Sequence, residues 1–507
     1  MSPQVAAAIP VALLLISFVA ALVVFALPEQ AVRRRSTVNL TAASLKVVLV
    51  AALFPLVFAG DHPEWRSPLL PGVDLVLRID SLSLLFAGLS VVLWLLTTIY
   101  AIGYLEGRPN RSRFFGFFSL CVTSTVGISF AGNLVTFLLF YEMLTLVTYP
   151  LIAHSGTTAA LKSARLYLVY GVAGGLALLF GTVWLTVAVG PVEFTAGGAR
   201  AVAELAAARP GTAIAIFALL VGGLAVKAAL FPLHGWLPRA MVAPAPVSAL
   251  LHAVAVVKAG AFGLVRVIDD VYGVEVALAL GVLTPVVVLA CVTILYGSLR
   301  ALFQSDLKKR LAYSTVSQVS YITLGLSMAS VSGTAGGLVH LVHQGLMKIT
   351  LFFCAGLFAE VMGVKTVRGL AGMGRRMPLT CLAFTIGAFG MIGLPPLAGF
   401  VSKWQLGIGA LDAATPQVLA VLAGSALLNA AYFLPLCHAM WFADPPARDD
   451  EPDTPHGARG GRGEAPPALL APTLITAGLA VLAGVVAVLP YSPLEVATYI
   501  AERSYLP

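Results

Sequence analysis

About fourteen apolar stretches, each roughly 20 residues long, follow one another along this sequence, and a helix of 20 apolar residues spans the hydrocarbon core of a bilayer. Lipid offers the backbone no hydrogen-bond partner, so only helices and closed barrels cross it. The composition agrees, because 59% of the 507 residues are hydrophobic and 11% are charged, against about 25% charged in soluble domains. We therefore expect an all-α, polytopic membrane protein.

The expected spans end where the apolar runs give way to short polar connections. Their limits are 4–27, 38–60, 80–104, 114–130, 134–152, 163–188, 212–233, 247–268, 275–297, 307–329, 336–358, 379–401, 416–443 and 468–490.

Charges between the spans predict the orientation, because lysine and arginine are enriched in cytoplasmic connections. Arg33, Arg34 and Arg35 follow the first span and no positive charge precedes it, which favours a retained span over a cleaved signal. With these arginines inside, about twenty basic residues fall in inner connections and only a few in outer ones. We predict that both termini lie outside the cell's inner (plasma) membrane.

The remaining composition excludes several classes of protein. The net charge of +8 comes from residues in short connections, with no basic patch interleaved with aromatics, so no nucleic-acid partner is expected. The cysteines share no CxxC spacing, which argues against disulfides, zinc and iron–sulfur clusters, and no other cofactor is predicted. They read as small core residues: Cys121, Cys291, Cys354, Cys381 and Cys437.

Five ionisable residues lie deep within the apolar stretches: Glu142, Lys227, Lys258, Lys348 and Lys403. A charged side chain at the bilayer centre costs at least about 2.5–3.5 kcal/mol, so such residues usually mark ion or proton pathways. The sequence therefore favours a transporter.

A helix break is predicted beside the first of these lysines. Pro232 cannot donate a hydrogen bond to the carbonyl of Ala228 and clashes with it, so the seventh span should break about one turn after Lys227. A freed carbonyl and a buried lysine would then share one site. Broken helices at membrane depth mark ion pathways in transporters.

A second break is predicted in the twelfth span at Pro395 and Pro396, ahead of Lys403. Aligning Phe231 with Pro395 sets an offset of 164 residues and lays spans 4 to 8 over spans 9 to 13. An odd number of spans per copy inverts the second copy, as in many secondary transporters. The predicted organisation is an N-terminal three-helix segment (1–113), a first five-helix repeat (114–268), an inverted second repeat (269–443), a disordered cytoplasmic loop (444–467) and a C-terminal helix and tail (468–507).

Glu142 shares a helix face with Thr145 and Tyr149, which gives a polar stripe on an apolar helix. A close pair of Glu142 and Lys227 would keep both groups charged, so we expect them to be in contact. A static ion pair that only orients helices is the alternative.

Histidines accompany the other buried lysines. His252 and Lys258 lie on one helix about 120° apart, so they could serve successive parts of a hydrated path. His340, His343 and Lys348 follow one another on another helix, and histidine exchanges protons near neutral pH. Structural hydrogen bonding remains the rival interpretation for both histidine groups.

These motifs resemble the antiporter-like subunits shared by Mrp-type cation/proton antiporters, respiratory complex I and membrane-bound hydrogenases. The similarity covers nearly the whole chain and is carried by Lys-Ala-Ala-Leu-Phe-Pro-Leu-His-Gly-Trp-Leu-Pro-Arg-Ala (227–240), Ala-Pro-Ala-Pro-Val-Ser-Ala-Leu-Leu-His (243–252) and Leu-Pro-Pro-Leu-Ala-Gly-Phe (394–400). The resemblance implies that Glu142 pairs with Lys227, that Lys258 links two half-channels and that Lys403 is the terminal lysine. Arg239 and the run Val-Val-Lys-Ala-Gly (256–260) are most similar to the D-type subunits of Mrp antiporters.

The expected function is proton translocation, within a hetero-oligomeric membrane complex that exchanges protons for Na⁺ or another monovalent cation. The expected route runs from Lys227, controlled by Glu142, through Lys258 and His252, and then through His340, His343 and Lys348 to Lys403. With no nucleotide-binding segment in the sequence, the energy would come from an ion gradient or a partner subunit. Three alternatives stay open: a redox-driven proton-pumping complex, a b-type haem protein with His252 and His340 as ligands, and a structural scaffold.

Overall fold

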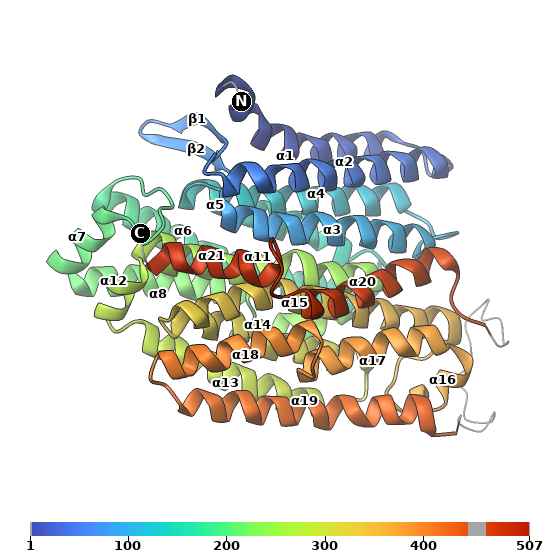
Figure 1. Ribbon diagram of the computed structural model, residues 1–507. Helices are drawn as coiled ribbons and strands as arrows, with labels where there is room; N and C mark the ends of the chain where they lie inside the picture. Colours follow the sequence, from blue (N-terminus) through green and yellow to red (C-terminus); the bar gives the residue numbers. More distant parts are fainter. Residues whose placement is uncertain (1–2, 445–462, 506–507) are drawn as a thin grey trace.

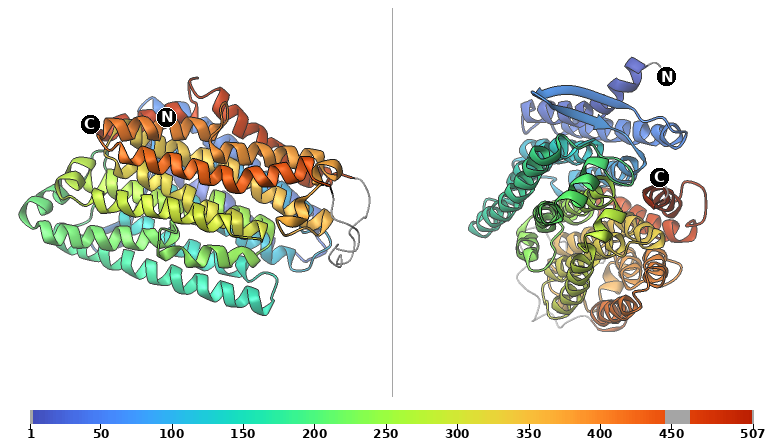
Figure 2. Two further views of the ribbon diagram at one scale, coloured as in Figure 1. Left: turned by 90° about the horizontal axis from the view of Figure 1, so that it is seen from below. Right: turned by 90° about the vertical axis from the view of Figure 1, so that its left-hand side faces the viewer.

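The computed structural model describes residues 3–444 and 463–505. Long helices run side by side in a single bundle (Figure 1), and an end-on view places the N-terminal helices at one edge (Figure 2). In the described residues, 12 helices are long and apolar enough to cross a membrane, which confirms the helical membrane fold. They are α1 (Pro3–Ala26), α2 (Val32–Phe58), α3 (Ser81–Tyr104), α4 (Arg111–Phe130), α5 (Leu134–Ile152), α6 (Thr158–Val189), α8 (Pro210–Lys227), the segment Ala245–Tyr272, α13 (Leu283–Leu302), α15 (Val331–Met362), α19 (Gln417–Phe442) and α20 (Pro467–Val485).

Two further expected spans have helical counterparts that are less apolar or shorter. α14 (Leu307–Ser327) carries a run of three basic residues in its first turn. α17 (Pro378–Ile392) and α18 (Ala398–Asp412), of 15 residues each, are the two halves of a broken helix. The span expected at 275–297 begins later, at Leu283, because residues 274–279 form a separate short helix, α12 (Val274–Ala279).

The connections gather at two opposite ends of the bundle. At one end, here called the hairpin end, isolated bridges join Leu77 to Ala131 and Asn133 to Glu193, and α7 (Arg200–Ala208) and both chain termini lie there too (Figure 1). At the other, here called the basic end, Asp306 bridges Thr366 close to α16 (Met373–Arg376). Of the cytoplasmic loop expected at 444–467, residues 445–462 lie outside the described residues.

A β-hairpin that the sequence analysis did not foresee precedes α3. Strands β1 (Glu64–Leu70) and β2 (Val73–Arg78) pair antiparallel around a turn in which Gly72 has φ 77°. Arg66 and Arg78 both form ion pairs with Glu193 at 2.6 Å, which ties the hairpin to the connection after α6.

The inverted repeat is visible in the order of helix lengths. α4, α5 and α6 have 20, 19 and 32 residues and precede the first break, while α13, α14 and α15 have 20, 21 and 32 residues and precede the second. α4 runs from the basic end to the hairpin end, whereas α13 runs the opposite way (Figure 1). The two copies therefore have opposite directions across the bundle.

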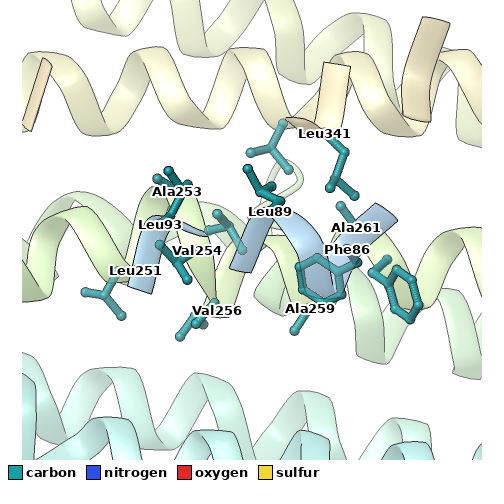
Figure 3. Packing of buried hydrophobic residues seen from close by; sticks show 14 of the residues in the cluster. Phe86, Leu89, Leu93, Leu251, Ala253, Val254, Val256, Ala259, Ala261 and Leu341 are labelled. Carbon is teal, nitrogen blue, oxygen red and sulfur yellow. The ribbon is translucent and has the colours of Figure 1, made fainter. Parts of the chain in front are cut away.

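The segment Ala245–Tyr272, here called the central segment, forms the centre of the bundle. It comprises α10 (Ala245–Ala249), η3 (Leu250–Val254), α11 (Val256–Val265) and η4 (Arg266–Tyr272), and all of its residues are buried. Figure 3 shows Phe86, Leu89 and Leu93 of α3 packed against it, with Leu341 of α15 nearby. Any charged group on this segment is consequently shielded from lipid.

Candidate functional site

The first helix break begins at Lys227 itself, about one turn earlier than the sequence analysis predicted. α8 ends at this lysine, and Ala229 has φ 56°, which takes the backbone out of the helix before Pro232 is reached. A cis peptide bond joins Phe231 to Pro232 within the break. The carbonyl of Val226 accepts a hydrogen bond of 2.8 Å from the indole N–H of Trp236, so the lysine does not satisfy it.

Lys227 reaches instead across to α5. Its amine donates a hydrogen bond to the backbone carbonyl of Tyr141 and lies 3.2 Å from the centroid of the Tyr141 ring. Lys227 is 1% exposed, so this carbonyl and this ring are its immediate surroundings. An aromatic face and a carbonyl oxygen can both stabilise an ammonium group without a negatively charged partner.

Glu142 lies next to this contact but does not pair directly with the lysine. The ion pairs among the described residues include none between Glu142 and Lys227, although the two charges act on each other electrostatically. The direct contact expected from the sequence is therefore absent, because the neighbouring carbonyl of Tyr141 takes the amine. The carboxylate of Glu142 lies against Gly175 of α6, where any Cβ would collide with it.

His252 and Lys258 occupy the central segment and are both 0% exposed. The ring of His252 stacks on Phe352 of α15 at 4.5 Å between centroids, and neither ring nitrogen has a hydrogen-bond partner in the protein. Lys258 donates a hydrogen bond of 2.7 Å to the carbonyl of Leu341 on α15. Both side chains of the central segment thus face the same neighbouring helix.

The buried face of α15 carries the next three predicted residues. His340 shares a hydrogen bond of 2.8 Å between Nδ1 and the hydroxyl of Ser402 on α18. Lys348 donates to the hydroxyl of Ser314 and to the carbonyl of Leu311 on α14. His343 is fully buried, and its ring nitrogens have no protein partner. These residues therefore do not form one cluster, since they reach towards different helices.

At the second break a lysine lies beside freed backbone carbonyls, which is the arrangement that the sequence predicted for the first break. Lys403, on α18, donates hydrogen bonds of 2.8 and 2.9 Å to the carbonyls of Met391 and Ile392 at the end of α17. Between the two half-helices lie Gly393, with φ 98°, and the cis bond between Pro395 and Pro396. A freed carbonyl pair and a lysine thus share this site, and Tyr321 places its ring 5.4 Å from the amine.

Together these contacts join the two breaks through the centre of the bundle. Gly260 of α11 lies directly against the backbone of Lys227 and Ala228, so the central segment touches the first break. Lys258 then contacts α15, and His340 of α15 contacts α18, the helix that carries Lys403. The charges of Lys258 and Lys403 also act electrostatically on His340. The predicted residues therefore lie along one continuous set of packed helices.

A polar cavity of about 710 Å³ opens at the basic end of this set. Its lining includes the residues just before α10, with Arg108, Lys308 and Glu360. Arg108 and Glu360 form an ion pair, and Lys308 donates to the carbonyl of Ala243 at 2.5 Å. The central segment that carries His252 and Lys258 begins at this cavity.

Several buried polar groups escaped the sequence analysis. Arg266 pairs with Asp80 at 2.8 Å and Asp270 at 2.7 Å, while both oxygens of the neighbouring Asp269 lack a protein partner. Asp80 also accepts a hydrogen bond from the backbone N–H of Ser83 and thereby caps the N-terminus of α3. Lys46 of α2 is 0% exposed. Because Lys46 stood inside an apolar stretch, the reasoning applied to Lys227 would have found it.

This arrangement defines a polytopic membrane protein with a lysine at each of two inverted helix breaks and buried amines and imidazoles between them. Residues 131–428 match the model of the NADH:quinone oxidoreductase/Mrp antiporter transmembrane family, and residues 71–115 match that of the N-terminus of complex I chain 5. The chain therefore belongs to this family.

Individual relatives come from both branches of the family. NADH-quinone oxidoreductase subunit N of Desulforudis audaxviator is 37% identical over 82% of this chain and 81% of its own length. The A/B component of a probable K⁺/H⁺ antiporter of Rhizobium meliloti is 33% identical over 87% of this chain but only 44% of its own length. The chain spans about half the length of several other curated relatives that it matches.

Solved structures agree on the fold. A chain in the Mrp complex of Dietzia sp. DQ12-45-1b superposes with a TM-score of 0.87 at 24% identity, covering 100% of this chain and 98% of that one. A chain of an archaeal membrane-bound sulfane sulfur reductase gives 0.83 at 25% identity, covering 99% and 98%. Both superpositions cover the helices at the two breaks.

Proposed function

We propose that this chain is the proton-translocating subunit of a multisubunit cation/proton antiporter, of the D type of Mrp antiporters. The main support is that Lys227, Lys258, His340 and Lys403 lie on helices that contact one another in that order. Gly260 packs on the first break, Lys258 bonds to Leu341 of α15, and His340 bonds to Ser402 of α18. Buried amines and imidazoles can bind and release protons near neutral pH, and water between them can complete the transfer. The chain acts as a transporter and catalyses no chemical conversion.

In this mechanism a proton from the cytoplasm reaches the first break or the central segment, which the cavity at the basic end adjoins. Lys227 binds the proton, and Glu142 modulates its charge through space. The proton continues by Lys258 and His252 to the α15 groups, His340, His343 and Lys348, and then to Lys403. Because the surroundings have a low dielectric, a change of charge at one amine shifts the proton affinity of the next. Transport can also run in reverse.

The assignment implies an orientation and partners. The basic end faces the cytoplasm, both termini lie outside, and the membrane is the inner (plasma) membrane. Other membrane subunits complete the complex, and Na⁺ or another monovalent cation crosses elsewhere in it. In the described residues no group of three or more His, Cys, Asp or Glu is arranged to hold a metal ion.

A test is cation-driven proton flux in vesicles that contain the intact complex with its co-purified partners. Lys227→Met should remove most of the flux, because methionine keeps the shape of the side chain but binds no proton. Lys309→Met is the matched control, since Lys309 is an exposed lysine at the basic end. Equal flux in Lys227→Met and the control would contradict the proposal.

A redox-driven proton pump is the second candidate, favoured by the 37% identity to a NADH-quinone oxidoreductase subunit. The same lysines would then be coupled to electron transfer in partner chains. Identification of the co-purifying chains separates the two candidates. Iron–sulfur or nickel proteins among them would support the redox pump, whereas small membrane subunits together with cation-dependent flux would support the antiporter.

A further inference from the structure

Lys46 of α2 is a buried amine that lies outside the route described above. It is 0% exposed and faces α1 and α3. Its amine donates a hydrogen bond of 2.6 Å to the hydroxyl of Ser17 on α1 and lies 5.5 Å from the ring of Trp94 on α3. Neither contact carries a charge. An ammonium group buried without a counter-charge is costly, so the amine favours its neutral form and can take up a proton.

Hydrogen-bonded side chains lead from Lys46 towards the basic end. The hydroxyls of Ser17 and Thr123 are 2.8 Å apart, and Ser119, one turn along α4 from Thr123, donates to the amide oxygen of Asn39 at 3.2 Å. Arg35, one turn along α2 from Asn39, donates to the hydroxyl of Ser112 at 2.6 Å. All of these side chains are buried. We call this series the polar file: Ser112, Arg35, Asn39, Ser119, Thr123, Ser17 and Lys46.

α3 lines the same region with three more polar groups. The hydroxyl of Ser90, the indole N–H of Trp94 and the hydroxyl of Thr98 are fully buried and have no hydrogen-bond partner in the protein. Their spacing of four residues places them on one stripe of the helix, the stripe that meets Lys46. Buried polar groups normally have partners, so a stripe of three favours a hydrated passage beside the amine.

Between Lys46 and the hairpin end, buried apolar side chains take the place of polar ones. Val50, Leu53 and Val57 follow Lys46 on the same face of α2 towards the hairpin end, and each is at most 4% exposed. At the basic end the file begins beside Glu29, whose carboxylate accepts the backbone N–H groups of Arg111 and Ser112 at 3.0 Å. Access is therefore one-sided.

We propose that Lys46 is a second proton-binding site, which samples the proton concentration at the basic end and does not lie on a path across the membrane. A proton that arrives along the polar file binds the lone pair of the Lys46 amine and leaves by the same way. The only covalent bond that forms and breaks at the site is this N–H bond. The charged groups along the file are Arg35 and, at its mouth, Glu29 and Arg111. Lys46 itself is faced by Ser17 of α1 and Trp94 of α3, and Thr123 of α4 lies behind Ser17.

The site has a route by which it can influence the rest of the protein. α3 contacts both α2, which carries Lys46, and the central segment, and Figure 3 shows Leu89 and Leu93 of α3 against that segment. A positive charge on Lys46 acts through this apolar layer, where screening is weak. Protonation of Lys46 would then lower the proton affinity of the ionisable groups on the central segment.

Access is tested by thiol labelling of the intact complex, which needs no transport activity. With the five native cysteines replaced by serine or alanine, Lys46→Cys should react with a small charged methanethiosulfonate added at the basic side, and Val50→Cys should not. Adding Ser112→Leu should slow the reaction at position 46. No reaction at position 46, or equal reaction at both positions, would overturn the proposal.

Proton sensing is tested by the pH dependence of transport in vesicles. Lys46→Met should shift the pH profile on the basic side and retain the maximal rate, whereas Val50→Met should leave the profile unchanged. A labelled Lys46→Cys combined with an unchanged profile in Lys46→Met would overturn the sensing role. If the complex carried no proton flux at all, the function proposed in the preceding section would fail, while labelling would still decide access to Lys46.

Discussion

The side-chain amine of Lys403 donates a hydrogen bond of 2.9 Å to the backbone carbonyl of Ile392 across the break between α17 and α18. The last carbonyls of a helix lack intrahelical partners and carry partial negative charge, so a cation at this place is stabilised. At the first break the lysine ends its own helix and reaches α5 instead. The two inverted copies therefore use their lysines differently.

Replacing Lys403 by methionine should loosen the second break as well as impair transport. The amine makes two hydrogen bonds to α17, and a hydrogen bond to a charged group contributes about 1.5–3 kcal/mol. We expect faster amide exchange at Gly393 and Leu394 and a large loss of proton flux. Lys309→Met, which changes an exposed lysine, should show neither effect. Normal flux in Lys403→Met would remove Lys403 from the route.

Gly175→Ala should displace the side chain of Glu142 although no charged residue is replaced. A Cβ at position 175 would collide with the carboxylate of Glu142, whereas a Cβ at Gly222 on α8 meets nothing within 4 Å. Overpacking of this kind costs about 1–3 kcal/mol. Proton flux in vesicles should fall severalfold in Gly175→Ala and stay normal in Gly222→Ala. The same flux in both variants would mean that the position of Glu142 is unimportant.

Arg266→Met should destabilise the fold at the hairpin end. Arg266 is 3% exposed and pairs with Asp80 and Asp270, so its loss leaves two carboxylates without their cationic partner. Breaking a buried ion pair costs about 3–5 kcal/mol. The thermal unfolding midpoint of the purified complex should fall, and adding Asp80→Asn should restore part of it. A midpoint equal to that of the unmodified complex would show that the pairs contribute little.

Acid should release the β-hairpin. Burial alone would raise the pKa of Glu193, but hydrogen bonds from Arg78 and Arg66 outweigh it and lower the pKa. A carboxyl with a lowered pKa stabilises the folded state above its ordinary value of about 4.3, and this contribution is lost as the pH falls through the lowered pKa. Amide exchange in β1 and β2, corrected for intrinsic rates, should therefore accelerate at low pH.

Glu193→Gln provides the control for that experiment. Glutamine cannot form the ion pairs with Arg66 and Arg78, so the hairpin should exchange faster already at neutral pH and respond less to acid. A hairpin that loosens equally with pH in both proteins would show that another group is responsible.

The sequence predicted the helices well because lipid imposes length and apolarity on each span. It also located both breaks, since Pro232 and the pair Pro395 and Pro396 cannot continue a helix. It placed the first break about one turn too late, because an alanine such as Ala229 gives no local signal for a positive φ.

Side-chain partners were harder to predict than helices. The carbonyl that captures Lys227 belongs to Tyr141, and only the relative rotation of α5 and α8 decides between it and Glu142. The β-hairpin was not predicted, because short strands are hard to recognise between long apolar spans. Pro71 and Gly72 nevertheless gave a turn signal. The predicted domain limits remain a prediction.

Lys258 is the amine on which the whole route depends, because it is the one lysine of the central segment and its hydrogen bond reaches α15. The most direct measurement is proton flux through vesicles containing the intact complex with Lys258→Met, compared with Lys309→Met at equal assembly. We expect Lys258→Met to abolish most of the flux and Lys309→Met to retain it. Undiminished flux in Lys258→Met would contradict a proton route through the centre of this protein.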